Sequence, residues 1–278
     1  MRRYLVSELR EGPGTLSGDE AHHLVRVNRA RAGQEIILFD GQGREARAVV
    51  TVVDRRGPSA SLRIERPEFI ERELPAPLEI FVAPPKGERM DALVRGLTEL
   101  GASRIASLET ERGLAGLGDH ALLRWRRIAQ EALKQCGRNR PPRIEGQLDL
   151  ATSLVSPGLS RACAGSESPA ETPTGAGADG SLCAPQREAA LRAVALPGAT
   201  QPLLQLLARG PLKGGIALWI GPEGGWTPAE ETTLRAAGAE PFQLGPAILR
   251  IETAALVAAG LAQQHLLPSA LPDRSQTL

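Results

Sequence analysis

The sequence has 278 residues, with 33 basic and 32 acidic side chains and a formal net charge of +1. This length predicts more than one domain and a core large enough to fold without disulfide or metal staples. Aromatic residues make up only 3%, which argues against a base-stacking platform, and three widely spaced cysteines with four histidines form no zinc-site pattern. The start lacks the apolar run of a signal peptide, and no run of about 18 apolar residues occurs. We therefore expect a cytoplasmic protein with no membrane partner.

The first third of the chain is rich in β-branched residues. Short runs at residues 36–39, 46–53 and 61–64 predict strands, and the Asp-Gly turn at 40–43 predicts a hairpin between the first two. A capped helix start follows Ser17. Residues 1–73 therefore predict a small barrel-like binding domain, and the proline-bearing stretch at 66–77 predicts a linker.

Strands and helices alternate in the next segment. Residues 78–83 and 105–108 predict buried strands, and residues 90–100 and 119–137 predict helices. This β-α-β-α order predicts a parallel sheet with helices on its faces. The apolar positions expected to be buried on the second helix are Leu122, Leu123, Ile128, Ala129, Ala132 and Leu133.

Positive charge concentrates in one part of the chain. Residues 86–143 carry 12 basic and 7 acidic side chains, and residues 122–143 carry seven basic side chains against Glu131 alone. Such a segment is typical of a polyanion-binding surface. A solvated helix face explains the same charge equally well, so the count alone leaves both interpretations open.

Residues 156–187 interrupt the pattern with serine, proline, alanine and glycine. A segment so poor in large apolar groups predicts a mobile surface insertion, to which we assign no function. Regular structure is expected to return with a strand at 190–196 and a short helix at 202–208.

The last third contains two strands that each run into a glycine-proline loop. A continuous apolar strand at 216–220 precedes Gly221-Pro222-Glu223-Gly224-Gly225, and a strand at 242–244 precedes Gly245-Pro246. Between them, Thr227, Pro228 and Glu230 form a helix start with a capping box, and that helix ends at Gly238. A final alanine-rich helix at 252–267 has small residues that suit a subunit interface as well as a core.

Several common site motifs are excluded. Two GxGxxG-like strings, at 41–46 and 175–180, lack the strand-turn-helix context of a dinucleotide site, and no Walker A string occurs. His22 and His23 diverge on a helix and cannot share one metal. No metal is therefore expected. Cys136 has no histidine nearby in sequence and is expected to be a small core residue.

The two glycine-proline loops predict a ligand site. Ligands of open α/β sheets bind at the carboxyl ends of strands, where glycines let backbone groups reach the ligand. Arg250 and Glu252 come directly after the second loop. The alternative interpretation is that both loops are ordinary tight turns. Because the motif occurs twice, we favour a ligand site.

These motifs together resemble the RsmE family of SPOUT-superfamily methyltransferases. The resemblance rests on the strings at 220–225 and 244–254, on Lys86 to Asp91, and on Glu131-Ala132 with Gln135 to Arg138. It extends over nearly the whole chain, apart from the insertion and the tail. It implies an α/β fold with a parallel sheet and a trefoil knot over residues 76–268, a PUA-like RNA-binding β-barrel over 1–73, and a tail at 269–278.

The resemblance also implies a function. The expected reaction is methylation of uracil N3 of a uridine in small-subunit (16S) ribosomal RNA, with S-adenosyl-L-methionine as cofactor. A homodimer and a substrate within an assembled or nearly assembled 30S particle are expected. The expected catalytic residues are Arg250, Glu223 and Glu252, with the identity of the base left open. The expected cofactor contacts are Ile220, Gly221, Pro222, Gly224, Gly225, Leu244, Gly245, Ile248, Leu249 and Thr253. The expected RNA contacts are Arg2, Arg3, Arg26, Arg29, Lys86, Arg89, Arg112, Arg124, Arg127 and Arg138.

The chain departs from the family pattern at three positions. Ala247 and Ile251 stand where the family usually has arginine and threonine, and Asn28 replaces a commoner leucine. Two alternatives therefore stay open: a SPOUT methyltransferase with another RNA target, and a non-catalytic RNA-binding assembly protein.

Overall fold

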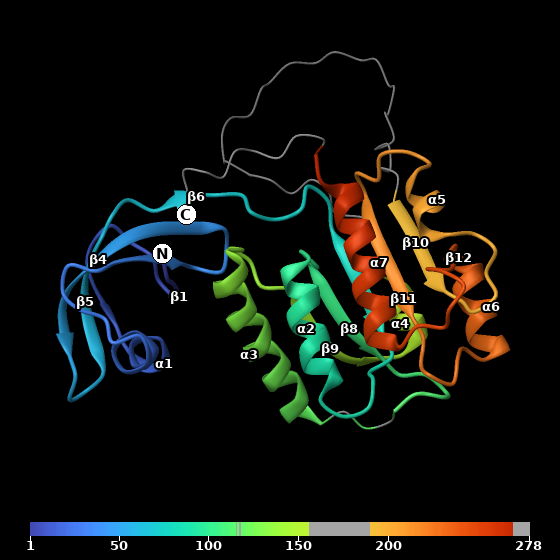
Figure 1. Cartoon of the computed structure of the whole chain (residues 1–278), viewed down its shortest axis with the longest axis horizontal. Helices are drawn as coiled ribbons and strands as arrows, with labels where there is room; N and C mark the ends of the chain where they lie inside the picture. The colour runs from blue at the N-terminus through green and yellow to red at the C-terminus, as the bar shows by residue number, and fades with distance from the viewer. Residues whose placement is uncertain (115, 117, 156–189, 269–278) are drawn as a thin grey trace, which may run out of the picture.

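The computed structural model describes residues 1–114, 116, 118–155 and 190–268. The insertion expected at 156–187 and the tail at 269–278 lie outside these residues. Two six-stranded sheets form the described chain, one from the first 69 residues and one from residue 78 onward (Figure 1). Among the described helices, none is both long and apolar enough to cross a membrane.

The N-terminal sheet has the strand order β1-β3-β4-β5-β2, with β6 paired to β4. β1 runs parallel to β3, and the other pairs are antiparallel. A short helix, α1 (Gly18–His22), continues into one π-helical turn, η1 (His23–Val27). The strands are β1 (Arg3–Leu5), β2 (Gly12–Leu16), β3 (Glu35–Phe39), β4 (Arg44–Asp54), β5 (Ser59–Ile64) and β6 (Glu68–Phe69).

The hairpin predicted at residues 40–43 is confirmed, because β3 pairs with β4 on either side of it. Three short strands, β1, β2 and β6, were not predicted. β2 has the sequence Gly-Pro-Gly-Thr-Leu, which reads as a loop. Its place at the end of the sheet explains the proline, because an edge strand tolerates a residue without an N–H donor.

Asp40 closes the hairpin. Its Oδ1 accepts hydrogen bonds from the N–H groups of Gln42 (2.8 Å) and Arg44 (3.1 Å), and its Oδ2 accepts one from Arg44 Nε (2.7 Å). Burial acts to raise the pKa of this carboxyl, but the hydrogen bonds outweigh burial and hold the pKa below its ordinary value. The ionised carboxylate therefore stabilises the folded sheet.

This geometry predicts a pH-dependent effect of Asp40→Asn. The stabilisation is fully present above the ordinary carboxyl pKa of about 3.9 and is lost as the pH falls through the lower folded value. We expect the variant to be less stable by about 1–2 kcal/mol at pH 6, with the difference shrinking toward pH 3. Hydrogen exchange of β3 and β4 amides, corrected for intrinsic rates, measures this difference in stability at each pH. A difference that persists unchanged at pH 3 would contradict the role of the carboxylate.

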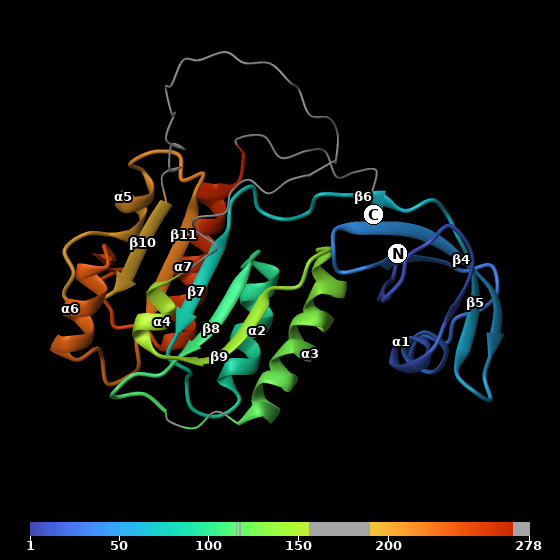
Figure 2. The same cartoon turned by 180° about the vertical axis from the view of Figure 1, so that it is seen from behind.

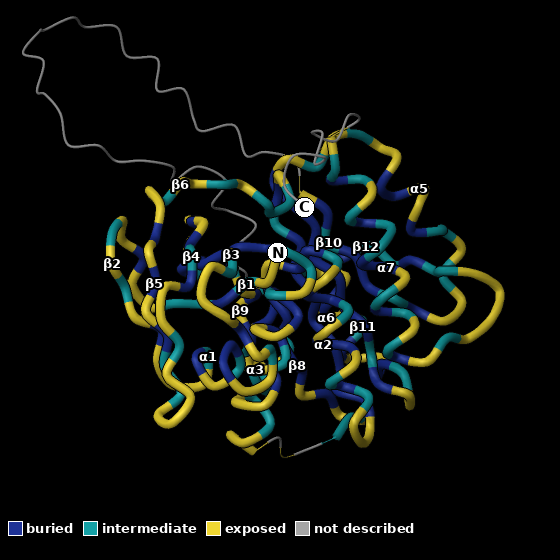
Figure 3. The backbone as a smooth tube through the Cα atoms, turned by 60° about the vertical axis from the view of Figure 1, so that its left-hand side comes forward, coloured by how far each residue is buried: buried dark blue, intermediate teal, exposed yellow. Residues whose placement is uncertain are grey.

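The C-terminal sheet is entirely parallel, with the strand order β12-β10-β11-β7-β8-β9. Every residue of β7, β8 and β11 is buried, as expected for strands covered on both faces (Figure 3). The strands are β7 (Leu78–Val82), β8 (Arg104–Leu108), β9 (Arg143–Leu148), β10 (Ala190–Ala195), β11 (Gly215–Ile220) and β12 (Glu240–Phe242).

Helices cover both faces of this sheet (Figures 1 and 2). One core cluster joins the sheet to α2, α3, α5 and α7, and a second, around the stacked rings of Phe81 and Trp219, joins it to α4 and α6. The helices are α2 (Arg89–Glu99), α3 (Asp119–Cys136), α4 (Leu150–Leu154), α5 (Leu203–Leu207), α6 (Pro228–Ala236) and α7 (Ile251–Leu266). The predicted alternation and parallel sheet are confirmed, while β9 and α4 were not predicted.

The buried face of α3 differs from the prediction. Trp125, Ala129, Ala132 and Leu133 are buried, whereas Leu123 is 60% exposed. The spacing of four, three and one residues follows one helical stripe, and the large Trp125 ring sets its phase. The strand expected at 242–244 was also misplaced, because pairing with β10 ends at Phe242.

Candidate active site

Three loops meet at the carboxyl edge of the parallel sheet. They follow the neighbouring strands β10, β11 and β12, whose ends lie at one edge because the strands are parallel. The loop after β10 is tied to the loop after β12 by a hydrogen bond from Gln243 N to Gln201 O (2.9 Å). Sequence reasoning missed this first loop, although its Pro197-Gly198 pair after a strand was an available signal.

The loop after β11 folds tightly over an indole ring. A Cβ at Gly221 would lie 2.7 Å from Trp226 ring atoms, and Trp226 is buried, with its Nε1 donating to Ala195 O (3.2 Å). Gly225 has a φ of 72° and donates its N–H to Pro222 O (2.9 Å). The positive φ and the close approach explain why glycine is needed at both positions. Gly221 therefore has no room for a side chain, whereas a side chain at Gly225 would meet open space but strain the backbone.

A neighbouring loop after β8 braces this turn. Arg112 Nη1 donates to Gly224 O (3.0 Å), and the N–H of Glu111 donates to Glu230 Oε1 (2.9 Å). Glu230 is buried, and its other oxygen accepts the N–H of Thr227 (2.8 Å), which confirms the predicted capping box. Arg112, expected to contact RNA, thus donates to the backbone of the glycine loop.

The loop after β12 is open to solvent. Ile248 is 89% exposed, and the backbone N–H groups of Leu244, Ile248 and Leu249 have no hydrogen-bond partner within the described part of the chain. These unpaired backbone N–H groups lie beside the glycine-containing turn after β11. Together they suit the polar edge of a small, near-neutral group such as the adenosyl part of S-adenosylmethionine. The residues of the three loops therefore fit the expected cofactor.

The two departures in this region lie in different environments. Ile251, the first residue of α7, is buried in the core, so the change from the family's threonine alters packing rather than a ligand contact. Ala247 is exposed in the loop. Arg250 occupies the N-cap position of α7 without a side-chain capping bond, is exposed, and has no ion pair among the described residues, so its charge is available to a ligand.

Arg89 joins the two candidate carboxylates. Its Nη1 lies 3.1 Å from Glu223 Oε1 and 3.4 Å from Glu252 Oε1, and its Nε donates to Lys86 O (3.0 Å). The second oxygen of Glu252, Oε2, is buried without a hydrogen-bond partner. Glu223 comes from the loop after β11 and Glu252 from the first turn of α7. Arg89 thus links three chain segments, a role that sequence reasoning did not assign to it.

Arg89→Met tests this link. Removing the cation leaves two acidic groups without their shared partner, and we expect a fall in Tm of about 2–4 °C, given the partial exposure of these pairs. The expected methyl transfer should fall at least tenfold, because both candidate carboxylates lose their orientation. The matched control is Arg95→Met, an exposed arginine on the same helix with no ion pair among the described residues. Equal effects of the two variants would contradict the proposed link.

The expected RNA contacts divide into two groups. Arg2, Arg26, Arg29, Lys86 and Arg127 are exposed. Arg124 is exposed too, but it pairs with Asp91 and lies 3.7 Å from Glu88. It lines a pocket of about 380 Å³ between the chain after β7 and the start of α3. No group of acidic, histidine and cysteine side chains in the described residues is arranged to hold a metal.

The structure corrects the expectation for Arg3 and Arg138. Both side chains are almost fully buried, at 7% and 8% exposed. Arg3 is paired with Glu45, and Arg138 with Glu73. Neither guanidinium is available to a phosphate. Sequence reasoning failed here because a count of positive charge cannot tell an exposed arginine from one paired inside the protein.

Comparisons with known proteins find matches to both parts of the chain. The family model of an RNA methyltransferase domain matches residues 72–167 and 179–263, and that of an RNA methyltransferase PUA domain matches residues 16–62. Ribosomal RNA small subunit methyltransferase E of Mycobacterium bovis is 32% identical over 249 residues, covering 88% of this chain and 84% of that protein.

Two solved structures each align with this chain over nearly the full length of both proteins. Ribosomal RNA small subunit methyltransferase E from Neisseria gonorrhoeae, bound to S-adenosyl methionine, aligns with a TM-score of 0.76 and 26% identity, covering 95% of this chain and 97% of that one. A putative methyltransferase from Legionella pneumophila with bound SAM aligns with a TM-score of 0.73 and 26% identity, covering 94% and 96%.

Proposed function

Since this chain belongs to the ribosomal RNA small subunit methyltransferase E family, we propose that it methylates uracil N3 of one uridine in 16S ribosomal RNA with S-adenosyl-L-methionine. The observation that carries the proposal is the meeting of three loops at the carboxyl edge of β10, β11 and β12, beside Arg250 and two carboxylates. The family supplies the choice of uracil N3.

The cofactor would be held by the glycine-lined loops. The residues proposed to contact the cofactor are Ile220, Gly221, Pro222, Gly224, Gly225, Leu244, Gly245, Ile248, Leu249 and Thr253. When bound, S-adenosylmethionine supplies a methyl group already activated by its sulfonium. The chain must then orient uracil and accept the N3 proton. Glu252, with one unpartnered oxygen, and Glu223 are the candidates for the base. Arg250 would stabilise the negative charge on the uracil carbonyl oxygens.

The finer architecture is part of the same proposal. A division into an RNA-binding β-barrel (1–73) and a methyltransferase domain (76–268) agrees with the separate cores of the two sheets. A trefoil knot is supported by the path of α7, which follows the edge strand β12 yet packs on the central strands β7 and β11. A homodimer is supported by exposed apolar groups such as Val257 on α7. We place the reaction in the cytoplasm, on an assembled or nearly assembled 30S particle.

Arg26 and Arg127 are the proposed phosphate contacts whose loss is easiest to interpret, since both are exposed and have no ion pair among the described residues. Changing both to glutamate should weaken binding to the small subunit and reduce the slope of log K against log salt by about one to two. Arg209→Glu is the control, because Arg209 follows α5 and pairs with Glu240 of the edge strand β12, at the opposite end of the sheet from β9. Binding measured across a salt series decides, and an unchanged slope would remove these residues from the RNA surface.

Deletion of the gene tests the function directly. Mapping of modified bases in 16S ribosomal RNA should show that an N3-methyluridine disappears, and that plasmid-borne protein restores it. If every N3-methyluridine survives the deletion, the proposed target is wrong.

A further inference from the structure

The end of α3 contacts the N-terminal sheet through polar groups. α3 lies between that sheet and the rest of the methyltransferase domain (Figure 1). Lys134 pairs with Glu20 of α1, Arg140 Nε donates to Gln42 O (3.2 Å), and the Arg140 guanidinium lies 5.2 Å from the centre of the Phe69 ring. The turn after α3 thus reaches across to the first sheet at several points.

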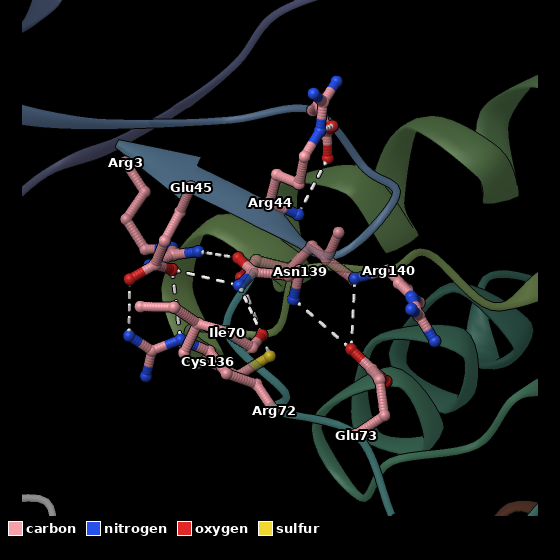
Figure 4. Close-up of polar contacts among 11 residues, drawn as sticks. Arg3, Arg44, Glu45, Ile70, Arg72, Glu73, Cys136, Asn139 and Arg140 are labelled. Atoms are coloured by element: carbon pink, nitrogen blue, oxygen red, sulfur yellow. Dashed lines mark hydrogen bonds and ion pairs between the residues drawn. The ribbon is translucent and has the colours of Figure 1, made fainter. Parts of the chain in front are cut away.

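Asn139 is at the centre of this contact (Figure 4). It is fully buried, and its Nδ2 donates to Glu45 Oε2 (3.0 Å) and to Ile70 O (3.1 Å), while its Oδ1 accepts a hydrogen bond from Arg3. Glu45 of β4 also pairs with Arg3 (3.0 Å) and Arg72 (2.8 Å). Both donor positions of the amide are therefore used, one on β4 and one on the chain after β6.

The chain between the two sheets is held by a second carboxylate. Glu73 accepts hydrogen bonds from Arg138 Nε (2.7 Å) and from the N–H of Arg140 (3.1 Å). Arg138 also donates to Thr98 O (2.6 Å) and Ala102 O (3.1 Å) at the end of α2. The segment that sequence analysis interpreted as a plain linker is therefore bonded at Ile70, Arg72 and Glu73.

We infer that Asn139 is a positioning residue that fixes the angle between the RNA-binding sheet and the cofactor edge. The inference rests on the proposed function. Domains of one chain move relative to each other by default unless something at their interface holds them. A fully satisfied buried polar network rigidifies the structure around it. RNA that touches both domains gains affinity only when their spacing and angle match it. Loss of this fixed angle should therefore weaken binding of the RNA substrate and leave cofactor binding intact.

A reciprocal exchange tests the inference. Asn139→Asp removes both amide donors and places a second carboxylate against Glu45. Glu45→Gln in the same protein exchanges the amide and the carboxylate and restores one hydrogen bond. With 30S particles from the deletion strain as substrate, Asn139→Asp should raise KM at least tenfold and leave kcat and the Kd for S-adenosylmethionine within threefold. The double variant should recover at least half of the lost kcat/KM. Arg140→Ala should raise KM severalfold, with Arg209→Ala as the control for charge loss.

The outcomes separate this inference from the proposed function. A wild-type protein that transfers no methyl group to these particles overturns the proposed function, and the inference with it. If the wild type is active, an unchanged KM in a folded Asn139→Asp, or a double variant no better than the single one, overturns the inference alone. If Asn139→Asp does not fold, Arg140→Ala decides, and a KM equal to that of Arg209→Ala overturns the inference.

Discussion

Gly221→Ala should weaken S-adenosylmethionine binding by about 10- to 100-fold. The added Cβ would lie 2.7 Å from Trp226 ring atoms, a distance that no relaxed contact shows. Trp226 cannot simply turn away, because it is buried and its Nε1 is bonded to Ala195 O at the end of β10. Relief must therefore come from movement of the loop itself. Overpacking of this kind costs about 1–3 kcal/mol, which corresponds to the stated loss of affinity.

Titration calorimetry with S-adenosylmethionine measures this effect. Gly57→Ala is the matched control, because Gly57 lies in the turn between β4 and β5 of the N-terminal sheet and a Cβ there meets Asp54 at an ordinary 3.7 Å. Thermal unfolding of both variants shows whether the fold persists. Affinity within twofold of wild type for Gly221→Ala would mean that the loop after β11 does not hold the cofactor.

Arg250→Ala should lower the rate of methyl transfer more than tenfold and leave cofactor affinity and Tm unchanged. Arg250 is exposed at the N-cap position of α7, makes no side-chain capping bond and has no ion pair among the described residues, so its removal costs the fold little. Its loss matters when the uracil carbonyl oxygens become negative, and one such donor contributes about 3–4 kcal/mol at most. Single-turnover rates with 30S particles report this step.

Two further variants locate the effect of Arg250. Arg250→Lys keeps the charge and should retain part of the rate. Arg235→Ala removes an exposed charge on α6 that, in the described part of the chain, pairs with Glu231 of the same helix, and should leave the rate unchanged. A single-turnover rate for Arg250→Ala within threefold of wild type would exclude Arg250 from the catalytic residues.

Local signals in the sequence predicted the parts of the site that depend on the backbone. The strand into Gly221, the capping box at Thr227 and Glu230, and the start of α7 each have a signature within a few residues, and each is observed. Such signals depend on residues within about one helical turn of each other, so they can be recognised from the sequence alone.

Contacts between distant segments could not be predicted in this way. Arg89 meets Glu223 and Glu252 across 134 and 163 residues, and Asn139 meets Glu45 across 94. Arg138 counted among the seven basic residues of the segment 122–143, yet α3 ends at Cys136 and Gly137 turns the chain with a φ of 84°. The side chain then points inward to Glu73. Exposed and buried basic side chains could therefore be told apart only once the fold was known.

Transfer of a labelled methyl group from S-adenosylmethionine to 30S particles of the deletion strain tests the central claim most directly. We expect about one methyl group per particle, located on N3 of a single uridine of 16S ribosomal RNA. We also expect no labelling of particles that already carry this methyl group. Absence of labelling, or labelling confined to another base or atom, would contradict it.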